Sequence, residues 1–263
     1  MNRVVINSIS KELETAAEFC RDEKIGIEIT DFAFPKNLDS NLSSQVERCR
    51  RLTVGIDPIC SHGPFFDLIA NSIDPAIVDV ARRRHRAALE ATHSVGASTY
   101  IAHLNYNPMI RHKSYREGFC RAVREFWLPF ADWAGERNIT ICLENMWEPD
   151  ATIQKEVVSI SKHPNLKASF DNGHALVYSK APASDWVQVL ADDLAHCHLH
   201  DNHGESDEHA VIGTGKENWI SLLAATREFS PEAILVIEND RFDLNRRSLA
   251  ELKRFQQGAA AFR

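Results

Sequence analysis

Residues 99–144 read TYIAHLNYNPMIRHKSYREGFCRAVREFWLPFADWAGERNITICLE, and they contain the unit from which the fold can be inferred. A short apolar run at 99–104 is followed by a long amphipathic segment at 115–136 and by a second short apolar run at 140–144. The short runs suit buried strands, and the amphipathic segment suits a helix. Because neighbouring parallel strands must be joined by a crossover, usually a helix, the stretch predicts a strand–helix–strand unit.

The same alternation of short apolar runs with longer amphipathic segments continues along the whole chain. The expected strands are 4–7, 25–30, 58–62, 99–104, 140–144, 166–171, 194–200 and 234–238. The expected helices are 11–21, 43–52, 75–95, 115–136, 153–161, 185–190, 218–227 and 246–256. Eight such units are what a (β/α)8 TIM barrel requires, and a doubly wound open sheet is the alternative. Since no Gly/Ser-rich linker, low-complexity tract or repeat divides the sequence, we expect residues 1–263 to form a single α/β domain.

The composition narrows the function classes. The 263 residues carry a net charge of −7, with 44% hydrophobic and 25% charged residues, which is typical of a protein that buries a sizeable core. The acidic balance disfavours nucleic-acid binding. Six widely spaced cysteines without a CxxC pair indicate buried thiols in a reducing compartment. No apolar run has the length of a signal peptide or of a membrane span, so we expect a cytoplasmic protein without membrane contact.

Side chains that can bind metal ions stand at or just after the C-terminal ends of six successive expected strands. They are His62, His103, Glu144, Asp171 with His174, His198 with His200, and Glu238. Barrel enzymes build their catalytic sites at this end of the strands. One such residue alone is more often a solvated rim residue or a hydrogen-bonded core group, but six strands that end in this way favour a shared metal site.

The strand period indicates where these side chains point. In residues 196–200, HCHLH, three histidines alternate with apolar residues, so all three face one way. If the apolar side packs against the helices, the imidazoles point into the barrel. In the expected strand 234–238, Ile234, Val236 and Glu238 share a face, which puts one carboxylate at the open end of an apolar column.

The donor types indicate the class of metal. Imidazole and carboxylate donors without thiolates suit Zn, Mn, Fe, Co or Mg better than copper. The sequence does not select among these ions. We expect no nucleotide cofactor.

Four groups of residues resemble the xylose isomerase-like TIM-barrel superfamily. They are LENMWE (143–148), SFDNGH (169–174), HCHLHDN (196–202) with DEH (207–209) and GTG (213–215), and VIEN (236–239). The chain is similar in particular to the sugar phosphate isomerase/epimerase group, whose relatives include ketose 3-epimerases, inosose dehydratase and endonuclease IV. The resemblance runs over nearly the whole chain, and its motifs are specific for the superfamily but weak for any one substrate.

The resemblance implies a ligand set for one divalent ion, Mn, Zn, Co or Mg: Glu144, Asp171, His198 and Glu238. It implies that Glu144 and Glu238 also shuttle a proton on the two faces of a sugar or sugar-like polyol, through an enediolate. His174 would bind a substrate oxygen, and His196 and His200 would support the ligands or contact the substrate. The function that follows is a metal-dependent sugar isomerase or epimerase.

Endonuclease IV supplies an alternative, because it binds three zinc ions and each of its ligand types has a counterpart here. His62 and His103 would join Glu144 at one ion, Asp171, His198 and Glu238 would hold the second, and His174, Asp207 and His209 the third. This hypothesis predicts a phosphodiesterase of AP endonuclease family 2. The segments after His103 and Glu144 depart from the repair enzymes, and no inserted basic and aromatic loop offers a minor-groove reader, so we favour a carbohydrate substrate over DNA.

Smaller features leave further alternatives open. Four aromatic residues lie just beyond strand ends and could cover a sugar ring or pack on one another: Phe65, Phe66, Tyr106 and Trp147. Lys216 and Arg241 could hold a phosphate or carboxylate, although a solvated surface role is favoured. An inosose dehydratase-like lyase is a further candidate. A non-catalytic metal- or sugar-binding barrel is disfavoured by the presence of both glutamates. Homo-oligomers are common among the relatives, but one sequence does not define the oligomeric state.

Overall fold

The structure is a computed structural model that describes residues 2–65 and 67–260, and its centre is a closed barrel of parallel strands. The strands are β1 (Val4–Ser8), β2 (Gly26–Ile29), β3 (Ile59–His62), β4 (Thr99–His103), β5 (Thr140–Glu144), β6 (Leu166–Asp171), β7 (Leu194–Leu199) and β8 (Ile234–Ile237). Each strand pairs in parallel with the next one in the sequence, and β8 pairs with β1. The expected (β/α)8 barrel is therefore confirmed, and the open doubly wound sheet is excluded.

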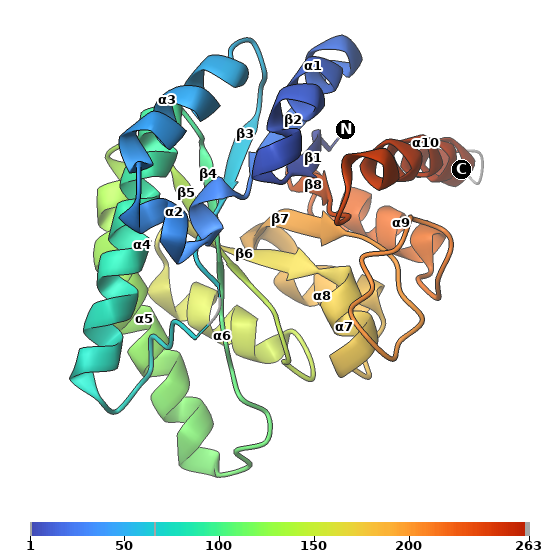
Figure 1. Ribbon diagram of the computed structural model, residues 1–263. Coiled ribbons are helices and arrows are strands. Elements are labelled where there is room, and N and C mark those ends of the chain that lie inside the picture. The colour runs from blue at the N-terminus through green and yellow to red at the C-terminus, as the bar shows by residue number, and fades with distance from the viewer. Residues whose placement is uncertain (1, 66, 261–263) are drawn as a thin grey trace.

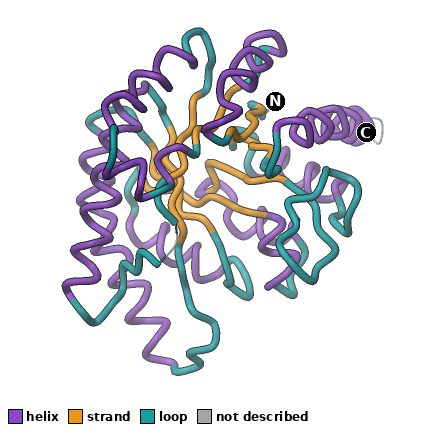
Figure 2. The backbone as a smooth tube through the Cα atoms, viewed as in Figure 1, coloured by secondary structure: helices purple, strands orange, loops and turns teal. Residues whose placement is uncertain are grey.

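Helices connect the strands and surround the barrel, as Figure 1 and Figure 2 show. The α-helices are α1 (Leu13–Glu23), α2 (Pro35–Asp39), α3 (Leu42–Leu52), α4 (Pro75–Val95), α5 (Lys113–Gly135), α6 (Thr152–Ser161), α7 (Asn172–Tyr178), α8 (Ala183–Leu190), α9 (Trp219–Phe229) and α10 (Phe242–Ala260). Short 3-10 helices, η1 (Ser10–Glu12), η2 (Asp31–Ala33) and η3 (Ala191–Asp193), join some of them. Within the described ranges, no helix combines the length and the apolar character that a membrane crossing needs.

Two of the helices, α2 and α7, fall in segments for which the sequence indicated none. α2 begins at Pro35, whose fixed φ suits the first position of a helix. α7 follows β6 without a loop because the Asp171 carboxylate accepts a hydrogen bond from the His174 backbone N–H at 2.7 Å and caps the helix. This cap also directs His174 back toward the end of the barrel.

The interior of the barrel has an apolar layer and a polar layer. The apolar layer is a small buried cluster of Val5, Cys60, Ile101, Ile234 and Val236. Alternate positions such as Cys197 and Leu199 point outward, into the larger core between the barrel and the helices. The expected facing of Ile234 and Val236 is therefore confirmed. The polar layer lies further along the strands and forms the floor of the candidate site.

The six cysteines are distributed over helices and strands, as the sequence indicated. All six are buried and have free thiols. Burial raises the pKa of the Cys20 and Cys49 thiols to about 12. They therefore contribute to packing as neutral, weakly polar groups.

Candidate metal centre

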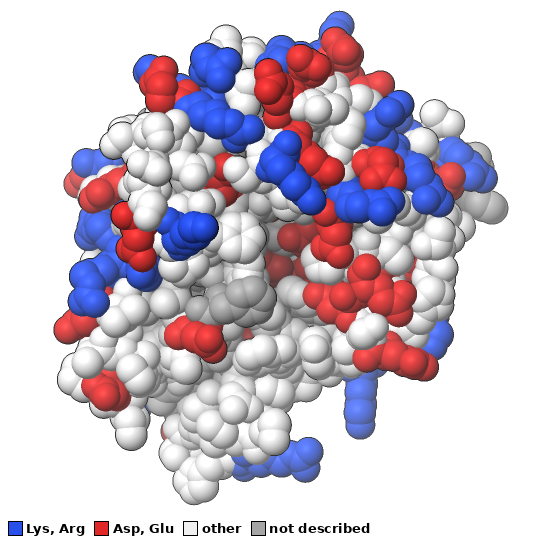
Figure 3. All heavy atoms as spheres, in the orientation of Figure 1, with Lys and Arg blue, Asp and Glu red and all other residues white. Residues whose placement is uncertain are grey.

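The C-terminal ends of the strands surround a pocket of about 320 Å³. Its polar wall is formed by His62, His103, Glu144, His174, Asp207, His209, Glu238 and Asp240. Phe34 and Phe65 contribute an aromatic part of the wall and contact each other edge to face. Figure 3 shows acidic side chains gathered beside a hollow on this face of the molecule. The pocket therefore combines metal-binding side chains with a partly apolar wall.

Four sequence-predicted ligands meet at this end of the barrel, and we call them the central set: Glu144, Asp171, His198 and Glu238. One donor atom of each lies within 4.8 Å of the donor atoms of the other three. The Nδ1 atom of His198 is 3.0 Å from a Glu144 carboxylate oxygen and 3.3 Å from a Glu238 oxygen. Glu144, Asp171 and His198 are at most 1% exposed. The structure thus brings together all four residues that the resemblance implied.

The sheet register places the central set. His198 on β7 is the register partner of Asp171 on β6 and of Val236 on β8. The end of β6 is fixed further by the Asn145 side chain, which accepts from the Asp171 backbone N–H at 2.8 Å and donates to its carbonyl at 3.0 Å. Glu238 follows directly after β8, and its backbone N–H donates to the Leu199 carbonyl. Strand ends rather than loops therefore hold these donors.

The charges of the central set fit a divalent cation. Burial disfavours charge on Glu144, but the charge and the hydrogen bond of His198 hold the pKa of its carboxyl well below the usual range. Burial also opposes charge on His198, yet Glu238, Glu144 and Glu28 together raise the pKa of its ring well above the usual value. A proton on the His198 ring thus balances the buried carboxylates, and a divalent cation bound by this set would displace that proton and take over the balancing charge. Carboxylate and imidazole donors of this kind suit Zn, Mn, Co or Mg.

His62 and His103, which we call the inner histidines, share the second oxygen of Glu144. Their Nε2 atoms lie 3.3 Å and 3.5 Å from Glu144 Oε2. The Nδ1–H of His62 donates to the Gly63 carbonyl at 2.8 Å, which directs Nε2 toward the carboxylate. Burial lowers the pKa of His103 to about 3, so this ring is neutral and can offer a lone pair to an ion.

A third group of side chains gathers around Asp207. His174 Nε2 and His209 Nε2 lie 3.3 Å and 3.1 Å from Asp207 Oδ2. His174 Nδ1 donates to the Asn145 carbonyl at 2.9 Å, which fixes its ring. We call Asp207 and His209 the outer pair, because both come from the loop after β7 and are 30% and 20% exposed. All nine positions of the three-ion hypothesis therefore lie in one region.

The loop that carries the outer pair is anchored by residues that the sequence did not single out. The buried Asp201 carboxylate accepts from the Gly213 N–H at 2.9 Å and from the Trp219 indole N–H at 2.9 Å. A Cβ at Gly215 would lie 2.3 Å from Asp201 Oδ1, so only glycine fits this approach. His209 has a positive φ of 45°, and the Asn239 amide holds its carbonyl at 2.7 Å.

Glu148 is a second buried anchor without a sequence signal. It is 1% exposed and accepts from the backbone N–H groups of Tyr106, at 3.2 Å, and Met146, at 2.6 Å. It thereby joins the loops after β4 and β5. Burial raises the pKa of its carboxyl to about 7.

The remaining sequence candidates lie away from the pocket. His200 is fully buried, its Nε2 faces Asp171 at 3.2 Å, and it stacks on His209 instead of lining the pocket. These contacts with Asp171 and His209 match the first of its two expected roles, support of the ligands, and a contact with substrate stays a prediction. Trp147 is 39% exposed and also lies outside the pocket wall. His196 supports the site from below, through Glu28.

The aromatic residues near the strand ends separate into different roles. Phe65 lines the pocket and contacts both inner histidines. Tyr106 packs against Tyr115 and Phe119 in the core. Phe66 lies outside the described residues. Of the three described members of this group, Phe65 is thus the one in the pocket wall.

Comparisons with known proteins agree with this architecture. Among solved structures, the TTHB071 protein from Thermus thermophilus, soaked with ZnCl2, superposes with a TM-score of 0.81 at 22% identity over 97% of this chain and 98% of that chain. A D-tagatose 3-epimerase-like protein superposes with a TM-score of 0.79 at 23% identity over 98% of each chain. At these identities the similarity establishes the fold.

Sequence comparison extends the relationship. The uncharacterized protein MJ1311 of Methanocaldococcus jannaschii is 27% identical over 242 residues, which cover 88% of this chain and 79% of that protein. The family profile described as xylose isomerase-like TIM barrel matches residues 23–260. Because this match covers most of the barrel, the chain belongs to the xylose isomerase-like TIM barrel family.

Proposed function

We propose that this protein is a divalent-metal-dependent isomerase or epimerase that acts on an uncharged sugar or sugar-like polyol through an enediolate. The observation that carries the proposal is the convergence of two carboxylates, Glu144 and Glu238, on one point together with Asp171 and His198. Two carboxylates beside one pocket provide a group to remove a proton and a group to return it. The name of the D-tagatose 3-epimerase-like neighbour supports this class of reaction.

The chemistry follows from these positions. A divalent ion held by the central set would polarise a ketose carbonyl and the hydroxyl beside it. One of the two glutamates removes the proton from the adjacent carbon, the C–H electron pair forms the carbon–carbon double bond, and the carbonyl oxygen takes the negative charge. The other glutamate returns a proton to the opposite face, which gives an epimer, and the carbonyl forms again. When C1 is the carbon that loses its proton, transfer of the O1 hydroxyl proton to O2, formation of the C1 carbonyl and return of a proton to C2 give the aldose isomer instead.

Two further groups would assist this reaction. His174 lines the pocket. Burial of its ring opposes a positive charge, but the nearby carboxylates of Asp171, Asp207 and Glu144 favour one. The pKa of His174 therefore lies well above its usual value. A ring that keeps its proton can donate to a substrate oxygen. Phe65 contributes an apolar wall that suits the face of a sugar ring and excludes water.

The pocket favours an uncharged substrate. Among the described residues, no lysine or arginine lines it, whereas four carboxylates do: Glu144, Asp207, Glu238 and Asp240. The sequence candidates for binding a phosphate, Lys216 and Arg241, lie outside the pocket wall, and Arg241 pairs with Asp243 at 2.8 Å. A phosphate would therefore meet the repulsion of four carboxylates without a lysine or arginine in the pocket wall to hold it.

One observation favours a second candidate, a phosphodiesterase with three metal ions. The inner histidines converge on Glu144, and His174 and His209 converge on Asp207. Three ions at these positions could activate a hydroxide and stabilise a leaving oxygen. The acidic pocket wall weighs against this candidate, because a DNA substrate also needs cations along its phosphate backbone.

The test begins with the metal content of protein purified without chelators or metal-affinity resin. Ketoses are then incubated in D2O and followed by proton NMR, abasic-site DNA is assayed for cleavage, and an inosose is assayed for loss of water. About one ion per chain with deuterium exchange and a new epimer would support the proposal. About three zinc ions with DNA cleavage would replace it by the second candidate, and dehydration would indicate a lyase.

Matched variants sharpen this test. Glu238→Gln removes one proton-transfer group and keeps the size of the side chain. Asp240→Asn removes one charge from the pocket rim, outside the central set. Loss of exchange in Glu238→Gln with retention in Asp240→Asn is expected. Exchange at the wild-type rate in Glu238→Gln would refute the assignment of Glu238.

A further inference from the structure

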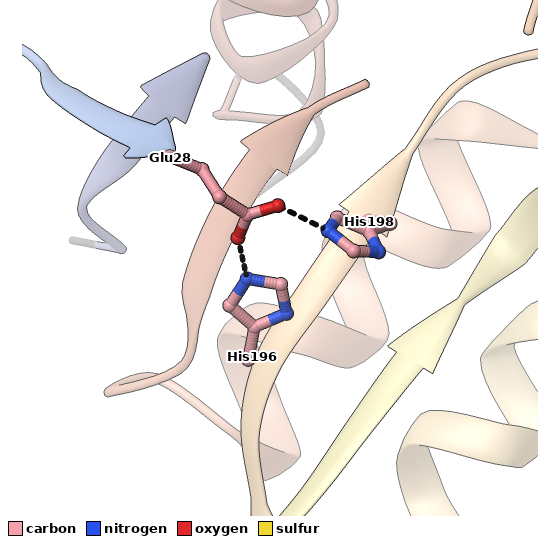
Figure 4. Close-up of side chains that lie close together, drawn as sticks. All are labelled: Glu28, His196 and His198. Carbon is pink, nitrogen blue, oxygen red and sulfur yellow. Dashed lines mark hydrogen bonds and ion pairs between the residues drawn. The ribbon is translucent and has the colours of Figure 1, made fainter. Parts of the chain in front are cut away.

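Glu28 is a buried carboxylate to which no sequence motif gave a role. It lies on β2 and is fully buried, and its two oxygens point to two different rings, as Figure 4 shows. Oε1 is 2.8 Å from His198 Nε2, and Oε2 is 2.9 Å from His196 Nε2. Both histidines belong to β7, which is not a neighbour of β2 in the sheet. This side chain therefore joins the two strands through the inside of the barrel.

The contact with Glu28 decides which nitrogen of His198 is free to bind an ion. An ionised carboxylate only accepts hydrogen bonds, so Nε2 of His198 carries the hydrogen that points to Glu28. In a neutral ring this leaves the lone pair on Nδ1, the atom that lies 3.0 Å from Glu144 and 3.3 Å from Glu238. Glu28 thus favours the one tautomer that offers a ligand atom to the central set.

Glu28 is itself held by a second hydrogen bond. His196 Nε2 donates to Oε2 of Glu28, which leaves His196 Nδ1 to accept from the Ser169 hydroxyl at 2.8 Å. Ser169 and His196 are register partners on β6 and β7. All of these groups are fully buried, and both hydrogen-bonding atoms of each ring are occupied. The carboxylate of Glu28 therefore has one fixed orientation.

A separate metal site at Glu28, His196 and His198 fits less well. One donor atom of each does lie within 4.8 Å of the others. Their N···O separations of 2.8 Å and 2.9 Å are, however, those of direct hydrogen bonds. An ion at this position would also take Nε2 of His198 and break the hydrogen bond that orients its ring.

We propose that Glu28 is a positioning residue of the metal centre, which holds the His198 ring with Nδ1 toward the central set while His196 and Ser169 hold Glu28. This inference rests on the metal binding in the proposed function but not on its sugar chemistry. Without the acceptor, the ring can turn and the competing tautomer becomes available. Loss of such an outer partner of a metal-binding histidine weakens metal affinity by roughly 10- to 100-fold.

The test compares Glu28→Met, Glu28→Gln and a control, Asp31→Asn, in the full-length chain. Methionine has a similar length and no strong acceptor, whereas glutamine keeps one oxygen that can accept from His198. Asp31 is a fully buried carboxylate just after β2. Its ion-pair partner is Arg48, whose Nη1 atom lies 3.8 Å from Asp31 Oδ1, and neither residue belongs to the metal centre. Zn²⁺ affinity is measured by competition calorimetry, and the visible spectrum of bound Co²⁺ reports the ligand geometry.

The expected result is a roughly 10- to 100-fold weaker Zn²⁺ affinity and a changed Co²⁺ spectrum in Glu28→Met. Most of the affinity should return in Glu28→Gln, and Asp31→Asn should match the wild type. Wild-type affinity in Glu28→Met would overturn the proposal. If that variant does not fold, nitrogen NMR of zinc-loaded wild type decides: a proton on Nε2 of His198 supports the proposal, and a proton on Nδ1 overturns it.

These outcomes separate the two proposals. In one outcome the wild type binds zinc and exchanges no sugar proton, while the Glu28 variants differ from it in Zn²⁺ affinity as expected. That result would support the role of Glu28 and refute the proposed reaction. A wild-type protein that binds neither Zn²⁺ nor Co²⁺ would refute both.

Discussion

The central set and the outer pair differ in how the chain holds them. Three members of the central set stand on strands and the fourth, Glu238, follows β8 directly, so the sheet register fixes their directions. The outer pair stands on a loop, 30% and 20% exposed, with His209 at a positive φ. Its position depends on anchors such as Asp201 and Asn239.

This difference separates two kinds of sensitivity. A change in the central set removes a donor without disturbing the strand that carries it. A change in an anchor leaves every donor present but releases the loop that places it. The structure therefore predicts loss of chemistry in the first case and loss of local order in the second, which the following measurements can distinguish.

The largest effect is expected for Glu144→Gln. Glu144 contacts His198 through one oxygen and the inner histidines through the other, so the substitution weakens the ligand set and removes a proton-transfer group. Turnover should fall by about 10³-fold, while the circular dichroism spectrum stays that of the wild type. Steady-state rates and metal content check this. Wild-type turnover in Glu144→Gln would contradict the acid–base role of Glu144 and the expected loss of chemistry when the central set is changed.

The next largest effect concerns Glu148 and pH. The pKa of its carboxyl is raised by burial from 4.5 to about 7, so the folded state binds more protons than the unfolded state between these values. The contribution of Glu148 to the free energy of unfolding should therefore be most favourable below pH 4.5 and fall by about 3 kcal/mol as pH rises to 7. Urea unfolding between pH 5 and about 7.5 should show this contribution as the difference in slope between the wild type and Glu148→Gln. Identical slopes would contradict a strongly raised pKa at this anchor.

A smaller effect is expected for Asp201→Asn. The amide group can replace only one of the two accepting oxygens, so a buried backbone or indole N–H loses its partner. The free energy of unfolding should fall by about 2 kcal/mol. Amide hydrogen exchange should become faster in the loop 202–217, while the strand ends that carry the central set keep their protection. Uniform loss of protection across the barrel would show that Asp201 supports the whole fold rather than this loop.

The sequence predicted the parts of the site that strand periodicity controls. The alternation in HCHLH correctly placed His198 inside the barrel. Glu238, expected as the last residue of the eighth strand, directly follows it and lines the pocket. The sequence also contained an indication for Glu28. A charged residue between Ile27 and Ile29 in a buried strand needs a partner inside the barrel.

The loops carried no comparable signal. Asp201 and Glu148 act by accepting hydrogen bonds from backbone N–H groups distant in the sequence, and no period relates them to these donors. The helix α7 was not expected either, since its capping residue Asp171 was recognised only as a ligand. Trp147 follows a strand end without lining the pocket, and His200 contacts Asp171 and stacks on His209, because the direction of a loop side chain depends on the loop conformation.

The smallest effect is expected for His209→Asn. This substitution also tests most directly how the outer pair differs from the central set. The substitution removes one ring from the outer pair and leaves the central set intact, so a single-ion isomerase or epimerase should keep its Zn²⁺ affinity within about tenfold. A three-ion phosphodiesterase would instead lose one of three zinc ions, since His209 lies 3.1 Å from Asp207 and completes the third group. Zinc stoichiometry with Asp240→Asn as the control distinguishes the two. If wild type and variant both hold one ion, His209 is not needed to bind it. A fall from three ions to two would instead make the loop part of the metal centre, like the strand residues of the central set.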